Sequence, residues 1–383
     1  MKEKYLRQIR NILFFMLAVT LMGICKITSS VSINLIMSMF IFLIMLPVVS
    51  ALERHKVPGG FATLIAALIA VAVVLGAVAF ILYTVNQLIA VIPAYVVRLN
   101  YLDSYIMGFV RRFRDVPQQG SFLSLLNIDW NTTLIPLLRS VSSSAINIVK
   151  NSLIILLLSM FLLMERHTLI PKLSQVTQNS ENPEKVAIMV ERVNRQVSKY
   201  LGMKFLLSFV TGLLFYATGL AVGLNLAFLW GVLALVMNFI PTFGSIIITL
   251  VTIFMAVLQF LPDWTPIIIV AAGTVATQTI IGNILDPRLQ GNQLNLSPFF
   301  ILASLSIFGY IWGIIGMFLA VPIMSIMQII FANMDSTRAI AIMVSSGSSL
   351  RKRMKAEKKG LEPGLFDDVM FPQDSLKKTQ KKP

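Results

Sequence analysis

The chain has 383 residues, of which 56% are hydrophobic and 13% are charged, and its formal net charge is +15. A mean hydropathy of +0.80 excludes a soluble surface and predicts an all-α polytopic membrane protein. The positive-inside rule explains the excess of basic residues with fewer assumptions than nucleic-acid binding does, so we expect no nucleic-acid partner. Because Cys25 is the only cysteine, the chain cannot form an internal disulfide.

Apolar runs of about 20 residues predict transmembrane segments, and the first three lie in residues 1–93. Basic residues precede the first run, residues 11–25, and follow the second, residues 31–50. This distribution predicts a cytoplasmic N-terminus. Since no small-x-small cleavage site separates the two runs, the first is interpreted as a retained span and not as a signal peptide. The third apolar helix is expected to begin at Phe61.

Residues 94–147 are predicted to form an extracytoplasmic helical domain. Apolar residues recur there at steps of three and four, from Val96 to Phe113, as in an amphipathic helix. Such a domain would act as a lid or a subunit contact, or it would only cover apolar surface. The fourth span, residues 148–164, ends at Glu165-Arg166-His167, which predicts a return to the cytoplasm.

Residues 165–204 are predicted to contain a cytoplasmic amphipathic helix. Asn182-Pro183-Glu184 is a favourable helix start, because Asn caps, Pro suits the first turn and Glu meets the positive end of the helix dipole. Apolar and basic residues then occupy different faces, as in a helix that lies along the headgroups of membrane lipid. A linker that lets two parts of the protein move relative to each other fits the same pattern.

The transport core is expected in residues 205–334, which contain two similar segments. Phe228 to Ala234 reads Phe-Leu-Trp-Gly-Val-Leu-Ala, and Tyr310 to Gly316 reads Tyr-Ile-Trp-Gly-Ile-Ile-Gly. A proline, Pro241 or Pro322, follows each copy. The residues of this repeat are Trp230, Gly231, Trp312, Gly313 and Pro322. An internal repeat and a coincidence of apolar composition both explain the match, and paired Gly- or Pro-interrupted segments are the best sequence pointer to a transporter's binding site.

The first copy is interrupted by Pro241-Thr242-Phe243-Gly244. A helix break at membrane depth is tolerated only where protein or a wet cavity surrounds the freed backbone groups, which favours a re-entrant hairpin. Two short spans with a tight turn are the alternative. If the second copy is also a hairpin, the two form an inverted pair, with tips at residues 241–245 and 316–322 meeting near the midplane.

The span from Thr265 to Leu285 is the most polar of the core. Thr274 and Gln278 share one face of an ideal helix, and Asn283 lies on another. Polar side chains in membrane helices either hold helices together or line a path. The predicted path residues are Asn238, Pro241, Thr242, Gly244, Ser245, Thr274, Gln278 and Asn283.

Asp286, Pro287 and Arg288 follow this span. Asp286 is the one attractive carboxylate for coupling to a cation, and a salt bridge that pins the helix end is the alternative role. The sequence contains no P-loop and no Gly-x-Ser-x-Gly, Cys-x-x-Cys or His-Glu-x-x-His motif. We therefore predict no enzyme activity, no cofactor and no metal site, and no ATP-driven transport by this chain alone.

Several segments, in order along most of the chain, resemble the autoinducer-2 exporter family of bacterial inner-membrane proteins. They are Pro47 to Gly60, Ser198 to Leu201, Phe228 to Gly231, Asn238 to Ser245, Gly282 to Arg288 and Gly316 to Pro322. The resemblance implies about eight spans, a place in the inner membrane, and either export of autoinducer-2 or sodium/proton antiport. The basic tail, residues 335–383, is longer than the family pattern and predicts a cytoplasmic C-terminus.

The leading hypothesis is a secondary transporter that exports a small polar solute, autoinducer-2 or a related quorum-sensing signal. A neutral, hydroxyl-rich solute needs hydrogen-bonding groups and no fixed charge, and the core supplies Asn238, Thr242, Ser245, Gln278 and Asn283. Cation/proton antiport, with Na⁺ and H⁺ as partners, and a non-transporting membrane scaffold are the alternatives. A homo-oligomer is expected, because association would hold the amphipathic helix at residues 94–114 still as a frame while the core moves against the first four spans.

Overall fold

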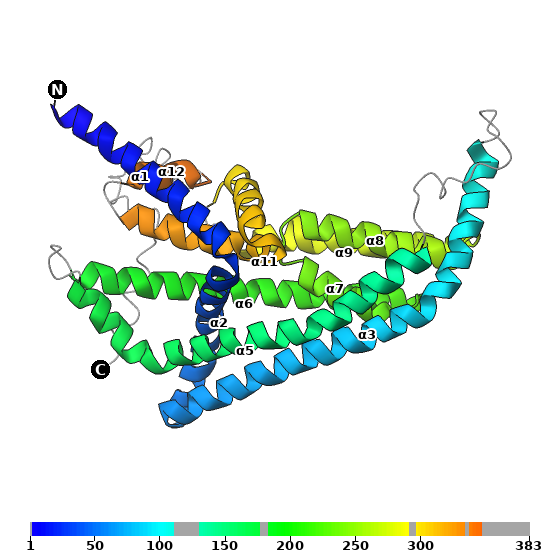
Figure 1. Cartoon of the computed structure of the whole chain (residues 1–383), viewed down its shortest axis with the longest axis horizontal. Coiled ribbons are helices and arrows are strands. Elements are labelled where there is room, and N and C mark those ends of the chain that lie inside the picture. Colours follow the sequence, from blue (N-terminus) through cyan, green and yellow to red (C-terminus); the bar gives the residue numbers. More distant parts are fainter. Residues whose placement is uncertain (1, 111–129, 177–182, 291–295, 334–336, 347–383) are drawn as a thin grey trace. The chain divides into compact units, whose positions relative to one another are not determined.

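The computed structural model describes residues 2–110, 130–176, 183–290, 296–333 and 337–346. Over these ranges every named element is a helix, and β-structure is limited to an isolated bridge between Leu296 and Ser345. This confirms the predicted all-α class (Figure 1). The elements are α1 (Lys2–Ile27), α2 (Ser29–Arg54), α3 (Gly59–Val110), α5 (Trp130–Val176), α6 (Pro183–Ala221), α7 (Ala227–Met237), α8 (Phe243–Phe260), α9 (Trp264–Thr277), the π-helix η1 (Gln278–Leu285), α10 (Asp286–Gln290), α11 (Pro298–Asn333) and α12 (Arg338–Val344).

Seven helical segments in the described ranges are long and apolar enough to cross a membrane, which confirms the polytopic class. They are Ser29–Arg54, Gly59–Val91, Asn147–Arg166, Val193–Ala221, Phe243–Phe260, Trp264–Leu289 and Pro298–Ala332. α7 is apolar but shorter than these segments. The predicted first span, residues 11–25, lies within α1. The total of about eight spans stays a prediction.

The chain divides into two compact units. The first falls in residues 1–33, 168–201 and 290–383, and it contains α11 with the second Trp-Gly copy. The second falls in residues 34–167 and 202–289, and it contains α7, α8, α9 and η1 with the first copy and the polar span. The predicted meeting of the two hairpin tips stays a prediction.

Two helices continue through boundaries that the sequence pattern suggests. α3 passes through Pro93 to its end, so the third span and the first part of the predicted outer domain form one helix. α6 begins at Pro183, which confirms the predicted helix start, and it includes residue 204, where the cytoplasmic segment was expected to end. Residues 111–129 of the predicted outer domain and residues 347–383 of the predicted tail lie outside the described residues.

The core of the second unit forms where α6, α7, α8 and α9 pack together. Its buried members include Phe215, Leu229, Trp230, Ala234, Ile248 and Val270. A β-carbon at Gly212 would lie 2.7 Å from the Gly231 carbonyl oxygen, and one at Gly231 would lie 2.8 Å from the Gly212 carbonyl oxygen. Glycines at such positions let membrane helices approach closely. Gly231 is therefore a packing residue inside the unbroken α7.

α7 and α8 form a helical hairpin, as predicted for the first copy. The 11 residues of α7 span about 17 Å, well short of a hydrocarbon core of about 30 Å. Thr242, between the two helices, has a φ of 65°, which is unusual for a residue with a β-carbon. A β-carbon at Gly244 would overlap the carbonyl oxygen of Met237, so only glycine fits there. Whether the hairpin is re-entrant stays a prediction.

The second copy also bends, but at a different place from the predicted one. α11 is interrupted at Gly313, whose φ of 64° and ψ of −142° are non-helical. Pro322, at the end of the predicted turn over residues 316–322, is fully buried inside the helix that follows the bend. The prediction of a turn at 316–322 is therefore wrong. The chain bends at Gly313 instead, because glycine has no β-carbon and can adopt the positive φ that this bend requires.

Side chains from the N-terminal helices hold the second bend. The Lys26 ammonium donates to the carbonyl oxygen of Tyr310 at 2.5 Å and lies 4.5 Å from the centre of the Tyr310 ring. The indole N–H of Trp312 donates to the Ser32 hydroxyl at 2.9 Å. The Tyr310 carbonyl precedes the break, where the regular helical donor is lost, so Lys26 acts as a cap from another helix.

Candidate functional site

A stripe of buried polar residues runs along α6 within the second unit. Lys204 is 3% exposed, and Ser208 and Thr211 are fully buried. Their spacing of four and three residues places them on one face of the helix. Buried polar groups are costly unless they are hydrogen-bonded, and buried charges unless they are paired. The partners of this stripe therefore define the candidate site.

Lys204 pairs with Asp286, the first residue of α10. The ammonium nitrogen lies 2.8 Å from a carboxylate oxygen, and the Lys204 side chain is 4% exposed. Asp286 lies where η1 runs directly into α10, and its backbone N–H donates to the Ile281 carbonyl oxygen inside this continuous helix. The sequence suggested a salt bridge as one role for Asp286, with Arg288 nearby; Arg288 is exposed, and Lys204 is the partner in the structure.

Ser208 connects α6 to the break between α7 and α8. The Asn238 side-chain amide donates to the Ser208 hydroxyl at 3.0 Å, and Asn238 is itself 3% exposed at the C-cap of α7. Ser245, near the start of α8, donates to the Asn238 side-chain oxygen at 3.5 Å. These three residues bring together the two helices of the hairpin and α6. Two predicted path residues, Asn238 and Ser245, therefore belong to one polar network.

The polar span contributes a side chain whose hydrogen-bonding groups are unused. Thr274 and Thr277 are buried, and each donates its hydroxyl to a backbone carbonyl one turn earlier at 2.7 Å. By contrast, both amide atoms of Gln278 are buried and have no hydrogen-bond partner in the part of the chain that the structure describes. An unsatisfied buried amide costs about 1–3 kcal/mol. Gln278 is therefore the residue best placed to bind a polar group from outside the protein.

Gly282 leaves space beside this amide. A β-carbon at position 282 would lie 3.7 Å from the Gln278 side-chain oxygen. Both residues belong to η1, a π-helical segment, and π-helical turns occur frequently at functional sites. The wider i→i+5 turns rotate the chain relative to an ideal α-helix.

The remaining predicted residues fall outside this network. Thr242 and Asn283 are exposed, and so are Pro287 and Arg288, while Pro241 is half-buried in the turn. Gly244 is required by the tight turn, as described above. Trp230 is buried and its indole N–H donates to the Asn225 carbonyl at 3.0 Å. Whether these residues line a path stays a prediction.

Sequence reasoning missed Lys204 and Ser208. Lys204 is the last charged residue before a long apolar run, and its partner Asp286 lies 82 residues away. A signal was nonetheless present, because Lys204, Ser208 and Thr211 follow helical spacing inside an otherwise apolar segment. Among the described residues there is no group of three or more His, Cys, Asp and Glu side chains that would hold a metal ion.

Comparison with known proteins shows the family of the whole chain. A model of the AI-2E family transporters matches residues 12–336. The AI-2 transport protein TqsA of Escherichia coli (strain K12) is 28% identical over 336 residues, which cover 87% of this chain and 94% of that protein. A provisionally named transport protein of Haemophilus influenzae is 29% identical over 342 residues, covering 88% and 96%. Another, from Borreliella burgdorferi, is 26% identical over 328 residues, covering 86% and 88%.

Proposed function

Because the chain belongs to the AI-2E transporter family, we propose that it exports a small polar solute, autoinducer-2 or a related quorum-sensing signal. The name of the Escherichia coli relative supports this substrate, and the names of the other two relatives give transport alone. The observation that carries the proposal is the buried, unpartnered amide of Gln278. The amide NH₂ group, with two donor hydrogens, and the acceptor oxygen carry no fixed charge and suit the hydroxyl and carbonyl groups of a neutral solute.

The setting of Gln278 supports a transport role for this amide. Asn238, Ser208 and Ser245 add neutral hydrogen-bonding groups in the same unit, at the break of the α7–α8 hairpin. Irregular backbone in membrane helices is expected where it lines a cavity, and here it occurs both at this break and in η1. Alternating access would then move the hairpin relative to the polar span.

Substitution of Gln278 separates binding from folding. Gln278→Leu keeps a similar size and removes both hydrogen-bonding groups. Export is expected to fall about tenfold, the loss of one good hydrogen bond to the solute, while the melting temperature stays the same or rises because an unsatisfied amide is removed. Autoinducer-2 is measured inside and outside cells with wild-type protein, with the variant and without the protein. Thr279→Val, at an exposed position of the same helix, is the matched control.

Two outcomes would count against this proposal. If cells with and without the protein partition autoinducer-2 equally, autoinducer-2 is not the substrate. If Gln278→Leu exports as well as wild type, the amide is not part of the path.

The Lys204–Asp286 pair favours a second candidate function, cation/proton antiport. A cation that binds the Asp286 carboxylate must displace the Lys204 ammonium, which repels the cation, so cation binding is coupled to the state of this ion pair. Asp286→Asn keeps the shape and removes the charge. We expect sodium-dependent proton movement in vesicles to be lost in this variant. If it survives intact, Asp286 is not the coupling site.

The proposed setting is the bacterial inner membrane, with both chain ends in the cytoplasm and the protein as a homo-oligomer. Basic residues around the first two spans and in the C-terminal tail support this orientation. Large apolar side chains such as Leu153, Phe161 and Leu250 are more than half exposed, and they would face lipid or a second copy.

A further inference from the structure

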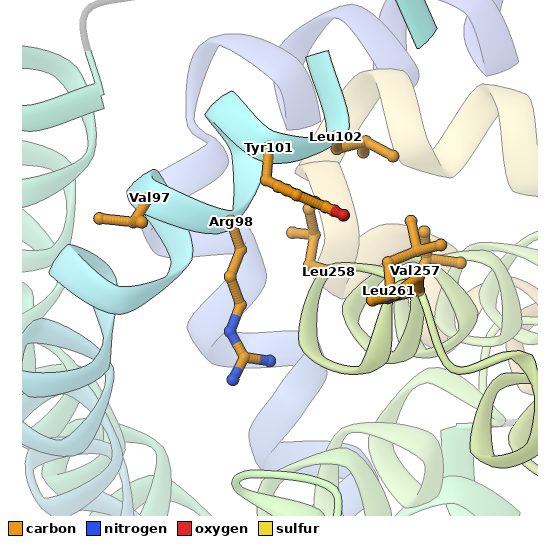
Figure 2. A pocket seen from close by; sticks show the side chains of 8 residues that line it. Val97, Arg98, Tyr101, Leu102, Val257, Leu258 and Leu261 are labelled. Carbon is orange, nitrogen blue, oxygen red and sulfur yellow. The ribbon is translucent and has the colours of Figure 1, made fainter. Parts of the chain in front are cut away.

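A cavity of about 340 Å³ lies between α3 and the end of α8, within the second unit. Its lining includes Val97, Arg98, Tyr101, Leu102, Leu258 and Leu261. Figure 2 shows Tyr101 and Arg98 reaching from α3, with Val257, Leu258 and Leu261 on α8 and just beyond its end. Next to the cavity, Tyr95 and Leu99 of α3 pack against Leu258 of α8, which fixes the two helices that form its walls. None of these residues belongs to the polar network around Lys204.

The cavity lies where two apolar spans end. Residues 59–97 of α3 carry no charged side chain, and Arg98 is the first charged residue of the helix. The α8 span ends at Phe260, directly before Leu261. Trp264, which is 52% exposed, begins the next helix, and tryptophan is enriched at the level of the lipid headgroups. Both walls therefore reach the membrane–water interface.

The charge of the cavity is one-sided. Arg98 is exposed and makes no ion pair or hydrogen bond in the described part of the chain, and no Asp or Glu lines the cavity. A guanidinium donates two parallel hydrogen bonds to a phosphate. Tyr101 is 52% exposed and presents a hydroxyl on the same helix, one turn further on. The other lining residues named here are apolar.

We propose that this cavity binds a phospholipid with an anionic headgroup. The phosphate contacts Arg98 and Tyr101, and one acyl chain lies against Leu258 and Leu261. A free anion would gain only the contacts with Arg98 and Tyr101, whereas a lipid also buries its acyl chain against the apolar wall. A negatively charged headgroup is preferred to a zwitterionic one because Arg98 is unneutralised. The lipid would join α3 to α8, the second helix of the hairpin. This proposal is independent of the transported solute.

The test uses the full-length protein in a mild detergent. Binding of phosphatidylglycerol and of phosphatidylcholine with the same acyl chains is measured by native mass spectrometry. Wild-type protein is expected to bind phosphatidylglycerol about tenfold more tightly, and Arg98→Gln is expected to remove most of that preference, as for the loss of a charged hydrogen bond. Val97→Trp adds bulk from an exposed position of the lining and is expected to weaken both lipids. The melting temperature without added lipid shows that both variants fold.

Lys150→Gln is the matched control, because Lys150 is an exposed base near the start of another apolar span and does not line the cavity. Its phosphatidylglycerol affinity is expected to stay within about twofold of wild type. Equal binding of the two lipids by wild-type protein would overturn the proposal. So would an equal loss in Arg98→Gln and Lys150→Gln, which would mean general attraction of anionic lipid. Displacement of the lipid by an equal concentration of glycerol phosphate would show a free-anion site and would also overturn it.

Discussion

The two Trp-Gly copies look alike in sequence but bend at different positions. In the first copy Gly231 lies inside the unbroken α7 and packs against Gly212, and the chain turns only at Thr242. In the second copy Gly313 is itself the bend. The tryptophans are alike, since each is buried and its indole N–H has an acceptor, Asn225 in one copy and Ser32 in the other.

A different pair of glycines is equivalent between the copies. Gly244 follows the first bend and Gly316 follows the second, and a β-carbon at either would overlap a backbone carbonyl oxygen, that of Met237 or of Phe308. Both bends are therefore so tight that the two helices touch through their backbones immediately beyond the turn. The sequence match aligns Gly231 with Gly313, whereas the structural equivalence is between Gly244 and Gly316. The two tryptophans match because each fills space in an apolar core. The position of a turn depends instead on where a glycine, which has no side chain, allows the backbone conformation of the turn.

The largest effect is expected when this shared contact is removed. Gly244→Ala and Gly316→Ala each place a methyl group on a backbone carbonyl that cannot move without opening the turn. We expect each to cost about 4 kcal/mol or more, or to abolish folded protein. The measurement is the yield and melting temperature of purified protein. Gly202→Ala is the control, because a β-carbon there meets nothing within 4 Å and alanine favours a helix. Wild-type melting of either variant would mean that the two turns are not built alike.

Much of this arrangement follows from local sequence, and the exceptions have physical reasons. The break at Pro241 to Gly244 was predictable because Pro and Gly interrupt an apolar run. The bend at Gly313 was not, since a lone glycine is also tolerated inside a helix and the packing around it decides. The Lys204–Asp286 pair joins residues 82 positions apart, and no local pattern encodes such a distance.

The polar span shows how a local rule fails. Assignment of faces assumed 3.6 residues per turn, and that rule correctly grouped Thr274 with Gln278 on a buried face. Beyond Gln278 the π-helical turns change the period, so the rule of 3.6 residues per turn no longer assigns faces there. The hydrophobic pattern gives no sign of this change, because Ile280, Ile281 and Ile284 suit either kind of helix.

An intermediate effect is expected at the Trp-Gly positions themselves. Gly313 has room for a β-carbon, with nothing within 4 Å, but its backbone conformation is almost restricted to glycine. Gly313→Ala is therefore expected to cost about 1–3 kcal/mol, and Gly313→Ser the same within a few tenths. At Gly231 the obstacle is steric, so Gly231→Ser should be clearly worse than Gly231→Ala. Chemical denaturation of the four variants measures this difference. A strong dependence on side-chain size at Gly313 would contradict a backbone origin.

The smallest effect is expected from the side chain that caps the second bend. The Lys26 ammonium satisfies the Tyr310 carbonyl, but Lys26 is exposed, so water can replace it. Lys26→Met keeps the length of the side chain and removes the donor, and we expect a loss of about 0.3–1 kcal/mol. The loss should shrink at high salt, because screening weakens an exposed charge at a helix end. Arg54→Met is the control, because Arg54 is another exposed base in the last turn of a helix and has no carbonyl partner on another helix within the described part of the chain. The measurement is the melting temperature of each variant at low and at high salt. A loss of stability above about 2 kcal/mol that salt does not change would mean that Lys26 is a structural part of the bend. The two copies would then differ in how their bends are stabilised as well as in the position of one glycine.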